Sequence, residues 1–174
     1  MKKILYGICG IGNGHFFRQV PVIEHLLENN HQILFFAYGE SLKLLARYQN
    51  NPLVKIVEVS VPYFIGNKEG VDFVTSEKIN SQFDYSINLK AFSQAQTWLG
   101  KPDLVISDYE PVCAQYGYAY LSPVVTIDQQ SKFFTRNTIK NLNGFNCEDE
   151  IMRLNMFFPV ADRFACSFFK VKES

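Results

Sequence analysis

Short hydrophobic runs alternate with segments of helical periodicity along the whole chain. In the third run, Val57, Val59 and Val61 share one side while Glu58 and Ser60 lie on the other, which is the pattern of a half-buried strand. Strands are predicted over residues 3–9, 32–37, 53–61, 103–107, 123–127 and 163–169. Helices are predicted over residues 17–27, 42–48, 81–99, 111–120 and 148–158.

The predicted helices are recognised by their apolar stripes. In the first, Phe17, Val20, Ile23 and Leu27 recur at helical spacing, and Pro21 indicates either a late start or a kink. The stripe of the third helix consists of Phe83, Ile87, Ala91, Ala95 and Trp98. Residues 62–80 show no such stripe and are predicted to be a long polar connection, which in compact domains is usually functional or disordered.

Strands that alternate with helices indicate parallel pairing through right-handed crossovers. We therefore predict an α/β fold with a Rossmann-like, doubly wound, mostly parallel sheet in three α/β/α layers. The expected strand order is 3-2-1-4-5 with a further strand. In that order the first and fourth strands are neighbours, and ligands bind outside the carboxyl ends of the strands at this switch point.

The composition is that of one folded domain. Of the 174 residues, 47% are hydrophobic and 20% are charged, which is enough for one core and little for two. Lys+Arg and Asp+Glu both number 17, so charge gives no reason to expect a nucleic-acid partner. The 4 cysteines contain no C-x-x-C pair and are interpreted as cytosolic thiols. No apolar run fits a signal peptide or a membrane span, so we expect a cytoplasmic protein.

A glycine-rich turn formed by Gly10, Gly12, Asn13 and Gly14 follows the first strand and leads into His15. Glycines bring backbone N–H groups close to a ligand, and the start of the next helix favours negative charge. The turn is not a dinucleotide fingerprint, which needs glycine where His15 stands, and it lacks the Walker lysine. His15 is either a helix-start residue or a general base, since imidazole titrates near neutrality.

Candidate partners of His15 follow the fourth and fifth strands. Asp108 ends the fourth strand beside the expected His15 loop, where it either orients the imidazole or caps the next helix. Glu110 is expected at the N-cap of that helix. Asp128 and Gln129 leave the fifth strand at the same edge, where they suit a hydroxyl-rich ligand or form an ordinary polar loop.

Two further features are weaker as functional signals. His25 and His31 show no metal-ligand spacing with any cysteine or carboxylate, so no metal site is predicted. The cations and aromatic residues of 132–136 and the pair Tyr63-Phe64 either dock onto a membrane-bound substrate or pack against the domain edge.

The motifs together resemble a known family. The pattern Gly10-x-Gly12-x-Gly14-His15-x-x-Arg18 after the first strand, with residues 102–108 in mid-chain, is similar to the N-terminal domain of GT-B glycosyltransferases. These include the lipid-intermediate N-acetylglucosaminyltransferase of peptidoglycan synthesis and the UDP-glucuronosyltransferases. Residues 107–111 and 123–128 look closest to prokaryotic glycosyltransferases labelled as teichoic-acid biosynthesis proteins.

The resemblance implies a two-domain enzyme of which this sequence covers one part. Residues 1–169 would form the acceptor-side domain, and residues 170–174 would begin a linker to a donor domain that is missing here or supplied by another chain. His15 would be the base and Asp108 its orienting carboxylate, with Glu110 as the alternative base. Substrate-binding roles are implied for Gly10, Gly12, Asn13, Gly14, Arg18, Tyr109, Glu110, Asp128 and Gln129.

The implied reaction is an inverting transfer of a sugar from a nucleotide-sugar, UDP-linked, to a hydroxyl acceptor such as a cell-envelope or lipid-linked glycan. No cofactor or metal is implied, contact with the inner face of a membrane is expected to be peripheral, and the chain alone is expected to be inactive. Two alternatives stay open: a non-catalytic sugar- or lipid-binding module and a nucleotide-binding Rossmann module. An α/β-hydrolase is discounted because the sequence has no nucleophile elbow.

Overall fold

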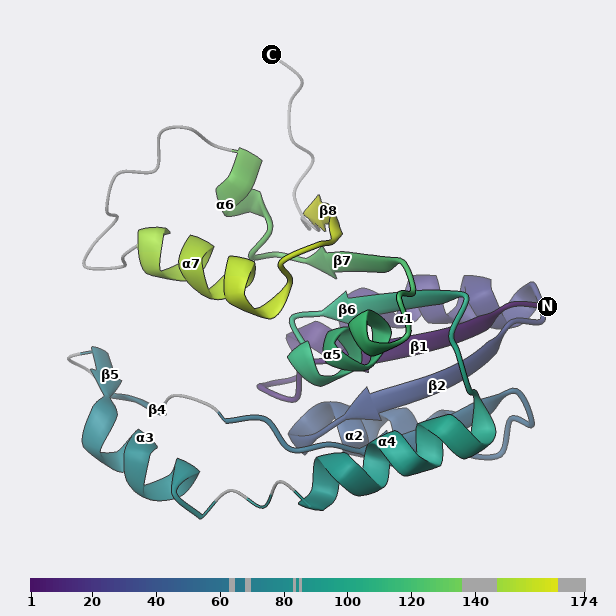
Figure 1. The fold of residues 1–174 in the computed structure, drawn as a ribbon, viewed down its shortest axis with the longest axis horizontal. Helices are drawn as coiled ribbons and strands as arrows, with labels where there is room; N and C mark the ends of the chain where they lie inside the picture. Colours follow the sequence, from purple (N-terminus) through teal and green to yellow (C-terminus); the bar gives the residue numbers. More distant parts are fainter. Residues whose placement is uncertain (63–64, 68–69, 83, 85, 136–146, 166–174) are drawn as a thin grey trace.

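The computed structural model describes residues 1–62, 65–67, 70–82, 84, 86–135 and 147–165. Within these residues, six strands form one parallel sheet in the order β3-β2-β1-β6-β7-β8 (Figure 1). The strands are β1 (Lys3–Ile8), β2 (Gln32–Ala37), β3 (Val54–Glu58), β6 (Leu104–Asp108), β7 (Val124–Asp128) and β8 (Asp162–Ala165). The expected strand order is therefore confirmed, and the chain reverses its direction of growth between β1 and β6.

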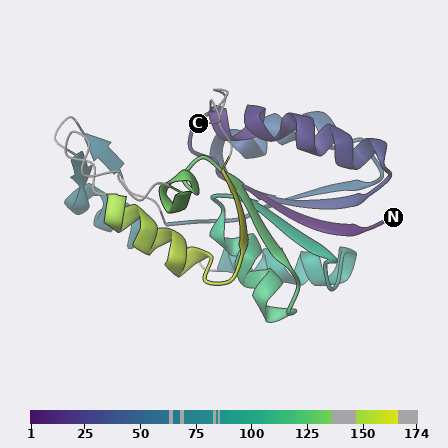
Figure 2. The ribbon, with the colours of Figure 1, turned by 90° about the horizontal axis from the view of Figure 1, so that it is seen from above.

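Helices cover both faces of the sheet, as the turned view in Figure 2 shows. One face carries α1 (Gly14–Glu28) and α2 (Gly39–Leu45), which continues into the short 3₁₀ helix η1 (Ala46–Tyr48). The other face carries α4 (Ser86–Trp98) and α5 (Pro111–Ala119). The protein is thus the predicted Rossmann-like α/β domain with three layers.

Each face of the sheet has its own core, because side chains alternate along a strand. On β1, Tyr6 and Ile8 pack with Phe16 and Ile23 of α1. Leu5 points to the other face and belongs to the core shared with α4 and α5. Both faces of the central strands are therefore apolar, as a parallel sheet buried by helices requires.

The first helix begins earlier than its predicted start at residue 17. It starts at Gly14 and runs through Pro21, which lies on the exposed face. The apolar stripe was also assigned to the wrong aromatic residue, since Phe16 is fully buried while Phe17 is 52% exposed. This change of phase places Gln19 in the buried stripe.

The predicted polar connection over 62–80 contains secondary structure. The strands β4 (Ile65–Asn67) and β5 (Gly70–Asp72) form an antiparallel hairpin, and α3 (Phe73–Asn80) follows directly. Asp72 caps α3 by accepting hydrogen bonds from the backbone N–H and the hydroxyl of Thr75. The next helix, α4, begins at Ser86 instead of residue 81, and Phe83 of its predicted stripe lies outside the described residues.

The C-terminal part adds two helices near the carboxyl end of β7. Residues predicted as a loop form the single turn α6 (Lys132–Thr135), and α7 (Cys147–Phe157) ends before Pro159 as predicted. The last strand is confirmed over its first residues, since β8 covers Asp162–Ala165, whereas residues 166–169 lie outside the described part. The guanidinium carbon of Arg163 lies 4.4 Å from the ring centre of Phe134 in α6, so this aromatic residue packs against the domain edge.

Candidate functional site

The glycine turn lies at the switch point between β1 and β6. Gly10 passes so close to the neighbouring loop that a Cβ on it would lie 2.0 Å from the backbone oxygen of Tyr38. Gly12 has φ +73°, a conformation that favours glycine. Helix α1 then begins at Gly14, and its N-cap residue Asn13 makes no side-chain capping bond. The turn therefore directs uncapped backbone N–H groups toward the carboxyl edge of the sheet.

His15 and Asp108 meet across this edge, as the strand order predicted. The Nδ1 atom of His15 lies 3.0 Å from Oδ1 of Asp108. The Asp108 side chain is completely buried, and the His15 side chain is 15% exposed. When Nδ1 carries the proton it donates to Asp108, and Nε2 remains as the basic nitrogen of the ring. The geometry thus fits a carboxylate that orients an imidazole, while the catalytic roles of both residues stay predictions.

Arg18 completes a charged cluster with this pair. Its Nη2 atom lies 2.8 Å from Oδ1 and 3.0 Å from Oδ2 of Asp108, and 2.9 Å from Nδ1 of His15. The Arg18 side chain is only 8% exposed. The guanidinium of Arg18 is directed at Asp108, and the predicted substrate-binding role of Arg18 stays a prediction.

Gln19 is a member of this cluster that was not predicted from the sequence. Its Nε2 donates to Oδ2 of Asp108 at 2.8 Å and to the backbone oxygen of Ile127 at 2.9 Å. Its Oε1 accepts from the Tyr6 hydroxyl at 2.5 Å. A signal was present, because residues 15, 18 and 19 share one side of a helix at spacings of three and four. Gln19 ties β1, β6 and β7 to the start of α1.

The surroundings of His15 favour its protonated form. Burial lowers the pKa of the imidazole, but the hydrogen bond to Asp108 and the neighbouring Cys9 outweigh this and raise the pKa to about 9. The raised pKa shifts the equilibrium of the imidazole toward its protonated form at neutral pH. Any role as a base then requires the site to lose that proton before reaction.

Two of the predicted site carboxylates face inward. Glu110 is fully buried and caps α5, since its side chain accepts from the backbone N–H groups of Val112 and Cys113 at 2.8 Å each. Burial raises the pKa of Glu110 to about 7 although these N–H groups lower it. Asp128 is also fully buried and accepts from the backbone N–H of Ser131 at 2.5 Å. The N-cap position of Glu110 is confirmed, and the substrate-binding roles of Glu110 and Asp128 stay predictions.

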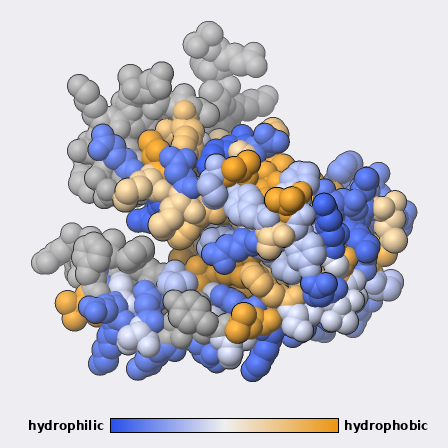
Figure 3. All heavy atoms as spheres, viewed as in Figure 1, coloured by the Kyte–Doolittle hydropathy of each residue, from blue (hydrophilic) through white to orange (hydrophobic). Residues whose placement is uncertain are grey.

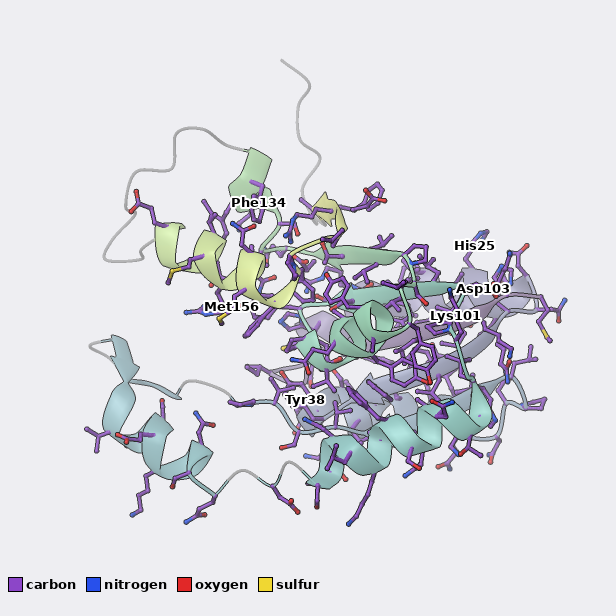
Figure 4. All side chains as sticks on the ribbon, in the orientation of Figure 1. His25, Tyr38, Lys101, Asp103, Phe134 and Met156 are labelled. Carbon is purple, nitrogen blue, oxygen red and sulfur yellow. The ribbon has the colours of Figure 1, made fainter. Side chains whose placement is uncertain are left out.

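Tyr109 and Gln129 reach a different surface. Both line a cavity of about 350 Å³ beside α7. A second cavity, of about 340 Å³, lies on the other side of the glycine turn and includes Gly10 and Tyr38 in its wall. Figure 4 shows Tyr38 at the carboxyl end of the strands, and His25 and Asp103 at the opposite end. The predicted site residues are therefore divided between one buried cluster and two flanking cavities.

Two features are absent from the described residues, a metal-binding cluster and a membrane-spanning helix. In that part of the chain, no group of three or more histidine, cysteine, aspartate and glutamate side chains is placed to hold a metal ion. No helix there is both long and apolar enough to cross a membrane.

The fold and this cluster define a doubly wound Rossmann-like domain whose candidate site lies at the carboxyl edge of the sheet. The chain belongs to glycosyl transferase family 1, whose family model matches residues 2–172. Its fold is that of GT-B glycosyltransferases. No curated protein matches the sequence.

Three solved structures illustrate the likeness. MurG of Acinetobacter baumannii has a TM-score of 0.52 and 14% identity, covering 98% of this chain and 44% of MurG. The glycosyltransferase VinC, solved in complex with dTDP, has a TM-score of 0.49 and 16% identity over 88% of this chain and 38% of VinC. The spinosyn forosaminyltransferase SpnP has a TM-score of 0.49 and 17% identity, covering 92% of this chain and 42% of SpnP. The chain thus spans well under half the length of the proteins it matches.

Proposed function

We propose that this chain forms the acceptor-binding half of an inverting glycosyltransferase. The observation that carries the proposal is the contact between His15 and the buried Asp108 at the switch point of the sheet. Membership of glycosyl transferase family 1 supports sugar transfer in general terms. The donor is a nucleotide-sugar, UDP-linked, and its binding domain belongs to the same polypeptide or to a partner chain.

In this proposal His15 removes the proton from the acceptor hydroxyl. The proton passes to Nε2 while Nδ1 donates to Asp108, whose charge stabilises the imidazolium that forms. The acceptor oxygen attacks the anomeric carbon from the face opposite the leaving group. The bond to the nucleoside diphosphate breaks and the diphosphate leaves with the electron pair, so the configuration at the anomeric carbon is inverted.

The remaining residues of the cluster support this step in different ways. Arg18 and Gln19 hold Asp108 by charge-assisted hydrogen bonds, so they act as positioning residues. The uncapped N–H groups at the start of α1 are donors that favour negative charge on the reacting groups. The glycines of the turn allow the acceptor to approach these donors closely.

The raised pKa of His15 predicts the pH dependence of the reaction. With a pKa of about 9, only about a hundredth of the imidazole is unprotonated at pH 7. Transfer limited by the proton-abstraction step should therefore accelerate roughly tenfold per pH unit through this range and level off near pH 9.

The acceptor in this proposal is a glycan of the cell envelope, free or linked to a lipid. That this domain contacts the inner face of a membrane stays a prediction. On the face drawn in Figure 3, hydrophobic side chains are scattered among hydrophilic ones. The pair Tyr63-Phe64, predicted to dock a membrane-bound substrate, lies outside the described residues. The closeness to teichoic-acid biosynthesis proteins also stays a prediction.

The test is a transfer assay on the protein that joins this chain to its donor domain. UDP- and dTDP-sugars are incubated with a pool of cell-envelope glycans and glycolipids, and labelled products are identified by mass spectrometry. The proposal expects transfer by the joined domains, none by the 174-residue chain alone, and a product anomer opposite to that of the donor. Robust transfer by the chain alone, or a product with retained configuration, contradicts it.

A further inference from the structure

The cavity beside α7 is a candidate ligand site with polar and aromatic residues in its wall. It starts at Tyr109, the residue after Asp108, and its wall also includes Gln130 and Glu150. Its volume of about 350 Å³ lies at the lower end of the range of small-molecule sites. It therefore has room for a small ring.

Two buried oxygen atoms of this cavity wall lack a protein partner. Among the described residues, no group donates a hydrogen bond to Oε1 of Gln130 or to Oε1 of Glu150. Glu150 is only 5% exposed, and its other oxygen is engaged by Arg153. A buried acceptor without a donor is costly, so hydrogen-bond donors of a ligand in the cavity would stabilise both atoms.

The kind of atom left unpaired restricts the chemistry of the ligand. Both atoms are hydrogen-bond acceptors, so the ligand must present donors, and a phosphodiester or an ionised carboxylate presents none. An ammonium ligand is disfavoured because Lys132 and Arg153 line the same cavity. Neutral hydroxyl groups satisfy both conditions, since each donates a hydrogen bond without adding charge.

The rest of the wall suits the body of a sugar ring. Tyr109 and Phe133 contribute aromatic rings to the cavity. Tyr109 has φ +56°, a conformation uncommon outside glycine, and its ring packs edge-on against Phe157 with centroids 6.3 Å apart. Aromatic walls with a few polar atoms match a ring that carries C–H faces and hydroxyl edges.

We infer that this cavity is a subsite for a neutral sugar ring of the acceptor, held by hydroxyl groups that donate to Gln130 and Glu150. The inference rests on the proposed function only in assigning the bound sugar to the acceptor, because the binding chemistry follows from the cavity itself.

Binding to the 174-residue chain tests the inference without any transfer reaction. Methyl glycosides of glucose, galactose and N-acetylglucosamine are titrated into the ¹⁵N-labelled chain, and amide shifts are followed by NMR. At least one glycoside should shift the amides of residues 129–133 and 150–153 with a dissociation constant in the millimolar range. The variant Glu150→Gln, which turns one carboxylate oxygen into a donor, should weaken this binding about tenfold.

Two further variants control the measurement. Gln130→Met removes the second acceptor while keeping the side-chain length, and it should weaken binding severalfold even if Glu150→Gln disturbs folding. Glu148→Gln makes the same chemical change on an exposed residue of α7 and should leave the dissociation constant unchanged. Circular dichroism checks that each variant is folded.

The remaining outcomes overturn the inference. These are the absence of shifts with every glycoside up to tens of millimolar, equal binding by Glu150→Gln, and shifts with inorganic phosphate in place of the glycosides. The proposed function fails separately, if the joined domains transfer no sugar. Glycoside binding with no transfer would leave a sugar-binding module, and transfer with no glycoside binding would remove only this subsite.

Discussion

Replacement of Asp108 by asparagine should destabilise the fold as well as the site. The Asp108 carboxylate is completely buried and receives the His15, Arg18 and Gln19 side chains at 2.8–3.0 Å. Asparagine keeps one acceptor oxygen but turns an NH₂ group toward these donors, and it leaves the guanidinium of Arg18 without its counter-charge. Breaking a buried ion pair on one side costs about 3–5 kcal/mol.

Urea unfolding followed by circular dichroism measures this cost. With a slope of about 2 kcal/mol/M, a loss of about 4 kcal/mol lowers the midpoint by about 2 M. Asp103→Asn is the matched control at the other end of the same strand. Its carboxylate is exposed and forms a 3.9 Å ion pair with Lys2, so the control should lose less than about 1 kcal/mol. A loss below about 1 kcal/mol for Asp108→Asn would show that the cluster does not stabilise the fold.

Four further variants test other parts of the account by the same unfolding measurement. Gly10→Ala should lose at least about 2 kcal/mol of stability, because the new Cβ would lie 2.0 Å from the Tyr38 oxygen. In Gly14→Ala the new Cβ meets nothing within 4 Å, so this variant should gain about 0.5 kcal/mol. Equal stabilities of the two variants would contradict the close approach of Gly10 to the Tyr38 backbone. Gln19→Leu should lose about 2–4 kcal/mol, because its buried partners lose their hydrogen bonds, and an unchanged midpoint would refute its linking role. Between pH 6.5 and about 9 the folded chain keeps a proton on His15 that the unfolded chain has released, so the free energy of unfolding should fall as pH rises. His15→Gln should flatten this slope, and a slope that persists in the variant would assign it to other groups.

The topology and the central contact could be predicted because they follow from the long-range pattern. Alternation of strands and helices fixes parallel pairing and leaves few strand orders. The order adopted places Ile8 of β1 opposite Asp108 of β6, so His15 and Asp108 come together although they are 93 positions apart. The capping role of Glu110 was equally accessible, because a carboxylate before Pro111 is a local signal.

The helix phase, the β4–β5 hairpin and the cavity at Glu150 could not be predicted, because they do not follow from the periodicity of the sequence. Phe16 and Phe17 are adjacent, so the sequence does not show which of them faces the core. Because Phe17 was assigned to the buried stripe in place of Phe16, Gln19 was not recognised as a buried residue. The hairpin of β4 and β5 consists of strands of three residues each, too short to show alternation. The cavity at Glu150 arises from α7 packing near the loop that contains Tyr109, which is a tertiary arrangement.

The turnover of a His15 variant in the complete enzyme tests the central claim most directly. His15→Ala is compared with His25→Ala, which changes an exposed histidine on the same helix at the far end of the sheet (Figure 4). If His15 is the base at the acceptor side, kcat falls by ~10²–10⁴-fold while the dissociation constant of the nucleotide-sugar stays the same, and His25→Ala keeps full activity. Near-normal kcat in His15→Ala would contradict the proposed role of this chain's site in glycosyl transfer.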